Sequence, residues 1–343
     1  MDNFFKNKVF FITGGTGSFG KAYTKFLLEN TKAKKIIIYS RDEQKQFYLQ
    51  NSKEYIKYQN RVRFFIGDIR DYSRLKIAMD NQVDYVIHAA ALKHVSLSEY
   101  NPFETIKTNI IGSQNLIQCC LELKIPNIIA LSTDKASSPI NLYGASKLAA
   151  DKLMVAANAY SKKNLTKFSV VRYGNVMASR GSIIPYLIKN IKNKYINVTD
   201  TRMTRFNITL EESIKFVNNC FKKMVGGEIF VPKLSSYRVT ELVRAICPNS
   251  KIKIIGIRPG EKLHEQMISS SDSLNTVELK DYYIILPYSG TNLKCNLFYD
   301  RKIKKKLCKK VKFGFAYESD KNKHFLTIQE IRKLAKKISL NEN

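Results

Sequence analysis

Short apolar runs alternate with longer amphipathic stretches through the first half of the chain. The runs are rich in Ile, Val and Phe, as in parallel strands covered on both faces, and they lie at 9–12, 35–39, 62–66, 85–88, 128–131 and 168–171. Between them, apolar residues recur at helical spacing, as at Ile106, Ile110 and Leu116 within 103–123. This alternation predicts an α/β fold with a Rossmann-type doubly wound parallel sheet.

After about residue 174 the rhythm changes to shorter elements separated by glycine and proline, with no Gly/Ser-rich linker at the join. We therefore expect a cofactor-binding Rossmann domain over 1–174. The remainder, 175–343, is expected to form mostly a smaller α/β substrate-binding lobe, interleaved with the first domain if its elements return to the sheet.

A glycine-rich turn follows the first predicted strand and opens a predicted helix. Glycines at three-residue intervals let the turn close tightly and let backbone N–H groups approach a pyrophosphate at the helix N-terminus. This strand–turn–helix setting predicts a dinucleotide site. Its expected contacts come from Gly14, Gly17, Ser18, Phe19 and Gly20.

The end of the second strand indicates which dinucleotide binds. An acid there would take the ribose hydroxyls of NAD, whereas Ser40, Arg41 and Lys45 suit the 2′-phosphate of NADP. A shift of one residue would instead place Asp42 or Glu43 at that point and favour NAD. We predict NADP, with further cofactor contacts after the third and fourth strands from Asp68, Ile69 and Ala89.

Residues after the fifth strand suggest proton-transfer chemistry. Tyr143 and Lys147 are four residues apart and share one helix face, so the ammonium is expected to lower the pKa of the phenol and let it act as a base. Thr133 ends the strand, where ligands bind in such sheets. Asp134 and Lys135 add a second acid–amine pair, and the alternative for that pair is a salt bridge within a loop.

Composition narrows the class of protein. The chain has 343 residues, 44% hydrophobic and 11% aromatic, and a formal charge of +29. Lysine is spread over the whole length beside abundant Asn and Ile, which indicates a compositional bias rather than a nucleic-acid surface. No apolar run reaches the roughly 20 residues of a membrane helix, and no secretory signal is visible, so we expect a cytoplasmic protein without membrane or nucleic-acid partners. The scattered cysteines and histidines predict neither disulfides nor a metal site.

The motifs together resemble a known family. The chain is similar to the extended short-chain dehydrogenase/reductases that act on nucleotide sugars, and most to the inverting, 5-epimerising UDP-N-acetylglucosamine 4,6-dehydratases of pseudaminic acid synthesis. The similarity rests on TGGTGSFG (13–20), YSRDE (39–43), GDIRD (67–71), HAAALKH (88–94), STDKA (132–136), NLYGASK (141–147), RYGNVMASRGS (172–182), MTRF (203–206), GEIFVPK (227–233) and IRPGEKLHE (257–265).

The resemblance implies a redox-neutral dehydration. Tyr143, helped by Thr133 and Lys147, would serve oxidation at carbon 4 of the sugar. Lys135, with its pKa lowered by desolvation, would take the carbon 5 proton, and Asp134 would protonate the departing carbon 6 hydroxyl. Substrate contacts are implied for Lys93, Lys135, Asn175, Arg180, Gly181, Ser182, Thr199, Arg205, Arg258 and Glu261. Lys93 would also lie near the nicotinamide, and relatives of this kind form dimers and hexamers.

Two other functions stay open at this point. A nucleotide-sugar 4-epimerase needs Thr133, Tyr143 and Lys147 but no Asp–Lys pair. A non-catalytic NADP- or RNA-binding protein would need none of the proton-transfer residues. The sequence fixes neither the oligomeric state nor the stereochemical outcome at carbon 5.

Overall fold

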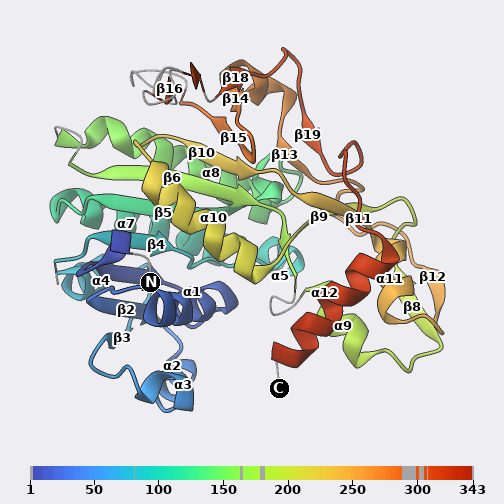
Figure 1. The fold of residues 1–343 in the computed structure, drawn as a ribbon, viewed down its shortest axis with the longest axis horizontal. Coiled ribbons are helices and arrows are strands. Elements are labelled where there is room, and N and C mark those ends of the chain that lie inside the picture. Colours follow the sequence, from blue (N-terminus) through green and yellow to red (C-terminus); the bar gives the residue numbers. More distant parts are fainter. Residues whose placement is uncertain are drawn as a thin grey trace.

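A ten-stranded sheet runs through the molecule (Figure 1), in the order β18-β14-β15-β10-β6-β5-β4-β1-β2-β3. The computed structural model describes residues 3–80, 82–162, 165–177, 182–287, 299–300, 305–306 and 308–341. The sheet strands are β1 (Val9–Thr13), β2 (Lys35–Ser40), β3 (Val62–Ile66), β4 (Tyr85–His88), β5 (Asn127–Thr133), β6 (Lys167–Tyr173), β10 (Ile229–Pro232), β14 (Thr276–Glu278), β15 (Tyr282–Ile285) and β18 (Lys309–Lys310).

The six predicted strands are confirmed as β1 to β6, and all of them pair in parallel. β10 extends this parallel part, while β15, β14 and β18 add an antiparallel edge. The order runs outward in both directions from β1 and β4, as in a doubly wound sheet, so the predicted fold class is confirmed. In such a sheet, ligands bind at the carboxyl ends of the strands near that switch point.

Helices cover both faces of the sheet. The helices of this part of the chain are α1 (Ser18–Asn30), α2 (Glu43–Gln50), α3 (Lys53–Ile56), α4 (Tyr72–Met79), α5 (Val95–Tyr100), α6 (Pro102–Ile106), α7 (Gly112–Glu122), α8 (Leu142–Ala156) and α10 (Leu210–Lys223). Successive residues of β1 face opposite sides. Phe10 packs with Tyr23 of α1 and Phe221 of α10, whereas Phe11 belongs to the core layer that contains Leu116 of α7. β1 is buried on both faces, which explains its unbroken apolar sequence.

The predicted helix over 103–123 is present but contains a wider turn, η2 (Lys107–Ile111), between α6 and α7. Such turns are frequent at functional sites. Here the turn includes Asn109, whose amide oxygen accepts from the Leu92 backbone N (2.8 Å). Its amide nitrogen donates to the Leu92 oxygen (2.9 Å) and to Ser146 Oγ (2.9 Å). Asn109 thereby joins the loop after β4 to α8.

Part of the second half of the chain returns to the main sheet, since α10, β10, β14 and β15 all pack on or pair with it. The rest has its own core, which includes Leu187, Ile196 and Leu242. It consists of β7 (Asn175–Val176), α9 (Ile183–Lys189), β8 (Tyr195–Val198), β9 (Thr204–Ile208), β11 (Ser235–Arg238), α11 (Val239–Ile246), β12 (Lys251–Ile254) and α12 (Ile328–Asn341). The buried residues of β13 (Gln266–Ile268) and β19 (Tyr317–Glu318) belong instead to the core of the main sheet. The lobe is the group at the right in Figure 1.

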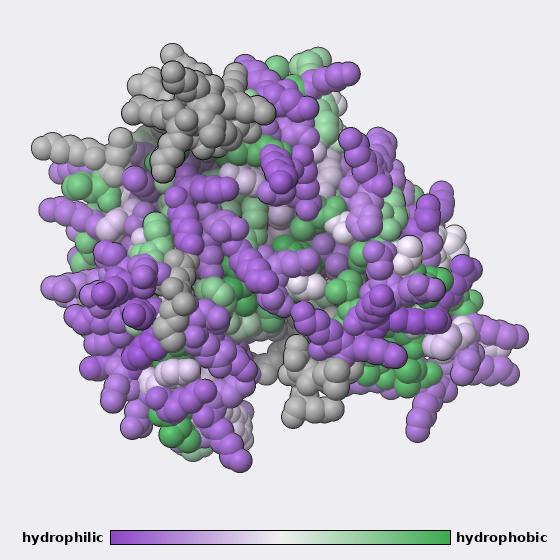
Figure 2. Space-filling view, in the orientation of Figure 1, coloured by the Kyte–Doolittle hydropathy of each residue, from purple (hydrophilic) through white to green (hydrophobic). Residues whose placement is uncertain are grey.

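Short elements complete the chain: η1 (Asn3–Phe5), η3 (Asp134–Ala136), η4 (Ala157–Tyr160), η6 (Ser270–Asn275), β16 (Tyr299–Asp300) and β17 (Lys305–Lys306). Hydrophilic side chains predominate on the face shown in Figure 2, with small hydrophobic patches among them. Within the described ranges, no helix combines the length and the apolar character needed to cross a bilayer. Cys119, Cys120, Cys220 and Cys247 are free thiols, but Cys308 is disulfide-bonded, so the expectation that the chain lacks disulfides is wrong there.

Candidate active site

Two cavities meet at the carboxyl ends of the parallel strands. The glycine-loop cavity, of about 600 Å³, runs from the turn after β1 to Lys147 on α8. The Lys135 cavity, of about 700 Å³, lies between the end of β5 and the segments 197–205 and 258–265. Five residues line both cavities: Lys93, His94, Thr133, Tyr143 and Val176. The two cavities therefore adjoin at Thr133 and Tyr143.

The turn after β1 brings backbone close to the glycine-loop cavity. Gly14 has φ +64°, and a Cβ at this position would lie 2.8 Å from the Ala90 backbone N, so a larger residue would clash with the loop after β4. α1 begins at this cavity with Gly17 as its N-cap. Since a helix N-terminus attracts anions, the turn forms a cradle that fits a pyrophosphate.

All residues predicted to bind the cofactor line the glycine-loop cavity. They are Gly14, Gly17, Ser18, Phe19, Gly20, Ser40, Arg41, Lys45, Asp68, Ile69, Ala89, Lys93, Tyr143 and Lys147. Their contacts with a dinucleotide stay predictions.

The register at the end of β2 decides which side chain meets the cavity. β2 ends at Ser40, and Asp42 is the N-cap of α2, where its carboxylate accepts from the Lys45 backbone N (2.9 Å) and pairs with the Lys45 ammonium. Asp42 does not line the cavity, whereas Arg41 does, with its Nη1 atom 3.7 Å from Asp68 Oδ2. A guanidinium therefore faces the cavity, and the acid next to it caps a helix.

Tyr143 and Lys147 are held at the junction by α8. Asn141 caps this helix by accepting from the Gly144 backbone N (2.8 Å), and Lys147 Nζ donates to the Leu131 oxygen (2.7 Å). Burial raises the pKa of Tyr143 to about 12, although Lys135 and a hydrogen bond with Thr133 oppose the rise. The expected lowering of the phenol pKa is therefore wrong, because burial dominates.

Asp134 and Lys135 lie on η3, directly after β5. Asp134 is fully buried and Lys135 lines the Lys135 cavity with 23% of its side chain exposed, so neither residue points to the outer surface. Lys135 Nζ lies 3.1 Å from Asp134 Oδ1, and the Thr133 hydroxyl also donates to that oxygen (3.0 Å).

The pKa of Lys135 shifts against expectation, whereas the pKa of Asp134 shifts in the expected direction. Burial alone would lower the pKa of Lys135, but Asp134 and Glu265 outweigh it and raise the pKa. The expectation of a lowered pKa for Lys135 is therefore wrong in this state. Burial raises the pKa of the Asp134 carboxyl against the opposing charge of Lys135, and Glu265 adds to the rise. A raised pKa suits a general acid.

Most residues predicted to contact the substrate line the Lys135 cavity: Lys93, Lys135, Asn175, Ser182, Thr199, Arg205, Arg258 and Glu261. Arg180 and Gly181 lie outside the described residues. Arg205 is turned partly toward protein, since its Nη1 donates to the oxygens of Thr204 (2.7 Å) and Leu263 (3.0 Å). Its other nitrogens lie 3.7 Å from Glu261 Oε1 and 3.6 Å from Glu265 Oε1.

Sequence reasoning missed three residues that shape the site. Glu265 contacts Lys135, Lys262 donates to the Ser137 oxygen (2.7 Å) in the same cavity, and Asn109 anchors α8. Glu265 and Lys262 both lie in the motif IRPGEKLHE (257–265), from which only Arg258 and Glu261 were predicted as substrate contacts. For Asn109 no periodic signal existed, because a polar residue on a helix is ordinary. Among the described residues, no group of three His, Cys, Asp or Glu side chains is placed to hold a metal ion.

The sequence profile of the family described as "Polysaccharide biosynthesis protein" matches residues 10–287. The chain belongs to this family. A relative from Campylobacter jejuni subsp. jejuni serotype O:23/36 (strain 81-176), named UDP-N-acetylglucosamine 4,6-dehydratase (inverting), is 54% identical, with 95% of this chain and 97% of that protein covered. The resemblance expected from the motifs is thus confirmed. A family relative named UDP-glucose 4-epimerase, from Rickettsia canadensis, is 41% identical over 84% of this chain and 85% of its own length.

Solved structures confirm the fold. Pen from Bacillus thuringiensis superposes with a TM-score of 0.86 at 39% identity, covering 98% of this chain and 99% of its own. The dTDP-glucose 4,6-dehydratase DesIV from Streptomyces venezuelae, with NAD and TYD bound, has a TM-score of 0.65 at 21% identity, with 74% of this chain and 86% of that chain covered. The similarity to DesIV shows the fold alone.

Proposed function

We propose that this chain dehydrates UDP-N-acetylglucosamine at carbons 4, 5 and 6 with inversion at carbon 5. The product would be UDP-2-acetamido-2,6-dideoxy-beta-L-arabino-hex-4-ulose, and the reaction would be the first step of pseudaminic acid synthesis. The observation that carries this proposal is the convergence of two proton-transfer pairs at one junction. Thr133 and Tyr143 line both cavities, and Lys135 lines the Lys135 cavity beside the buried Asp134.

The side chains have separate roles in this reaction. Tyr143 takes the proton of the carbon 4 hydroxyl, and the Thr133 hydroxyl holds the phenol in place. A ketone at carbon 4 acidifies the carbon 5 proton, which Lys135 removes. Asp134, whose pKa is raised by burial, gives a proton to the carbon 6 hydroxyl, which leaves as water. Lys147, bonded to the Leu131 oxygen, fixes the cofactor ribose near Tyr143.

The cofactor is proposed to be NADP. When bound, the nicotinamide would supply the hydride chemistry that oxidation at carbon 4 and reduction at carbon 6 require. Arg41 and Ser40 at the cavity wall support a 2′-phosphate, and the use of Asp42 as a helix cap argues against an acid at the ribose. We further propose a homo-oligomer, a dimer or hexamer, which light scattering on the purified protein would measure.

The test is incubation of the purified protein and NADP with UDP-N-acetylglucosamine in deuterated water, followed by NMR. A 4-keto-6-deoxy sugar carrying deuterium at carbon 5, with the inverted configuration, is expected. The Rickettsia relatives named UDP-glucose 4-epimerase make epimerisation the second candidate. Recovery of the carbon 4 epimer alone, without loss of water, would establish that candidate and reject dehydration.

A further inference from the structure

Glu265 is the second carboxylate on Lys135. Its side chain is 2% exposed, and its Oε1 atom lies 2.9 Å from Lys135 Nζ, opposite the 3.1 Å contact of the same ammonium with Asp134. The Lys135 ammonium thus contacts two buried carboxyl groups in the wall of the Lys135 cavity. The dehydration described above uses Asp134 and Lys135 but leaves Glu265 without a role.

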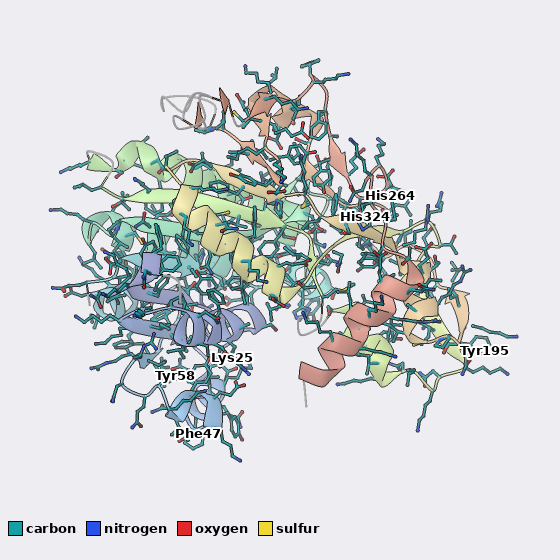
Figure 3. All side chains as sticks on the ribbon, in the orientation of Figure 1. Lys25, Phe47, Tyr58, Tyr195, His264 and His324 are labelled. Atoms are coloured by element: carbon teal, nitrogen blue, oxygen red, sulfur yellow. The ribbon has the colours of Figure 1, made fainter. Side chains whose placement is uncertain are left out.

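The position of Glu265 does not depend on Lys135. The Glu265 backbone N donates to Ser319 Oγ (2.9 Å), and the Ser319 backbone N donates to the Glu265 oxygen (2.8 Å). Ser319 Oγ lies 2.7 Å from Thr204 Oγ1 on β9, and that oxygen also contacts Nδ1 of His264 (2.8 Å). Figure 3 labels His264 near β9 and β11. The backbone of Glu265 is therefore held in place by Ser319, and the partly exposed Lys135 side chain contacts the Glu265 carboxyl group.

Both carboxyl groups have room for a proton. Asp134 Oδ2 and Glu265 Oε2 are buried, and neither has a hydrogen-bond partner within the described part of the chain. Protonation at either oxygen thus breaks no hydrogen bond. The charges that face Glu265 come from several elements: Asp134 and Lys135 on η3, Arg205 on β9, and Lys262 in the segment 258–265.

We propose that Glu265 is a positioning residue that acts through Lys135, taking one proton from its Nζ atom so that the amine can abstract the proton on carbon 5. This inference rests on the proposed function. A Lys135 Nζ–H bond breaks and a Glu265 Oε–H bond forms. The free lone pair on Nζ then takes the carbon 5 proton, and the C5–H electron pair is conjugated with the carbon 4 carbonyl.

Elimination completes the proton balance. The C6–O bond breaks, Asp134 gives its proton to the departing hydroxyl, and water leaves. The Lys135–Glu265 pair then holds one proton more than at rest and releases it to solvent. A proton from solvent reaches the opposite face of carbon 5 after carbon 6 has been reduced.

The charges around Glu265 decide how readily it accepts this proton. Burial would raise the pKa of Glu265, but Lys135 and Arg205 outweigh burial and lower it, which opposes the transfer while the Arg205 guanidinium faces Glu265. A diphosphate that engages Arg205 competes for that guanidinium charge, which moves the pKa of Glu265 back toward the value that burial favours. Substrate binding thereby prepares Glu265 to accept the proton.

The test compares Glu265→Gln with the wild-type protein, using UDP-N-acetylglucosamine and NADP in deuterated water. Reduced nicotinamide, seen by its absorbance, reports oxidation at carbon 4, and NMR reports exchange at carbon 5 and the 6-deoxy product. The variant is expected to oxidise the sugar at near the wild-type rate but to exchange and dehydrate about 100-fold more slowly. Its residual exchange should rise with pH, because Lys135 must then lose a proton to solvent, while wild-type exchange changes less over that range.

The control is Glu261→Gln, which removes a carboxylate 3.7 Å from Arg205 that makes no ion pair with Lys135. It is expected to raise the KM and to keep the wild-type ratio of carbon 5 exchange to oxidation. Equal ratios in Glu265→Gln and wild type would overturn the inference. If Glu265→Gln fails to fold in a thermal melt, Glu265→Asp decides: a selective loss of exchange supports the inference, and an equal loss of both steps rejects it. Absence of dehydration by the wild-type protein would reject the proposed function itself.

Discussion

Gly144 lies directly against the carbonyl group of Lys135. A Cβ at residue 144 would lie 2.3 Å from the Lys135 oxygen and 3.1 Å from its carbonyl carbon, both of which are backbone atoms. Because Gly144 follows Tyr143 on α8, this contact sets the distance between the phenol and the Asp134–Lys135 pair. The absence of a side chain at residue 144 thus allows Tyr143 and the Asp134–Lys135 pair to lie close together.

Gly144→Ala should therefore displace η3 and separate the two pairs. We expect a loss of about 1–3 kcal/mol in the free energy of unfolding, as for other overpacked sites, and a larger fractional loss of dehydration than of carbon 4 oxidation. The control is Ala145→Gly at the exposed neighbouring position, which costs about 1 kcal/mol of helix stability without a clash. Chemical denaturation and product NMR measure both effects. A Gly144→Ala protein with the wild-type ratio of the two activities would contradict this account.

Lys135→Ala should stop the reaction after oxidation. The variant removes the proposed base for the carbon 5 proton, so we expect bound reduced nicotinamide and little 6-deoxy product, with cofactor binding retained. Lys262→Ala is the matched comparison, since Lys262 lines the same cavity and donates to the Ser137 oxygen. It should weaken substrate binding and leave carbon 5 exchange measurable at saturation. Dehydration by Lys135→Ala at the wild-type rate would remove Lys135 from the mechanism.

Arg41→Ala should weaken NADP binding more than NAD binding. Loss of a hydrogen-bonded charge contact costs about 1.5–3 kcal/mol, so the Kd for NADP should rise about tenfold to a hundredfold, while the Kd for NAD changes little. Calorimetry with both dinucleotides measures the difference. Arg63→Ala, at an exposed position on β3 outside both cavities, controls for the loss of one positive charge. An equal rise in the Kd values for NADP and NAD would show that Arg41 does not bind the 2′-phosphate.

His88 should make stability depend on pH. Its ring lies between Thr13 Oγ1 (2.8 Å) and Ser113 Oγ (3.0 Å), and burial, followed by repulsion from Lys147, lowers its pKa to about 3. The unfolded chain therefore binds this proton at a higher pH than the folded chain does. As the pH falls from about 6 toward 3, His88 should cost the protein about 1.4 kcal/mol of unfolding free energy per pH unit.

Denaturation of His88→Gln over the same pH range isolates this contribution. The variant should show a shallower decline than the wild-type protein, although its stability at neutral pH can be lower because two buried hydrogen bonds change. Parallel curves for the two proteins would show that His88 is not the residue responsible.

The sheet and the glycine loop could be predicted from the sequence because their signals are local. An unbroken apolar run such as 9–12 requires cover on both faces, and glycines 14, 17 and 20 specify a turn by their spacing. The register at Arg41 was less certain, because it depends on which residue caps α2, and the structure assigns that place to Asp42.

Contacts made over long sequence distances could not be predicted. Nothing near Lys135 in the sequence reveals Glu265, which follows 130 residues later, directly before β13, and contacts Lys135 in the folded chain. The same contact explains why the pKa of Lys135 is raised and not lowered as expected, because the negative charge of Glu265 opposes the effect of desolvation. The predicted direction of the Tyr143 pKa shift was wrong for a related reason. The sequence predicts which helix face carries Tyr143, but it does not predict how deeply that side chain is buried.

The pinning of Glu265 by Ser319 has a consequence for the order in which the protein matures on the ribosome. The residues that line the glycine-loop cavity end at Leu210, whereas the carboxylate beside Lys135 is fixed only once Ser319 has been synthesised and has docked. A nascent chain thus contains every residue that lines the glycine-loop cavity more than a hundred residues before it contains the serine that fixes Glu265 in the Lys135 cavity.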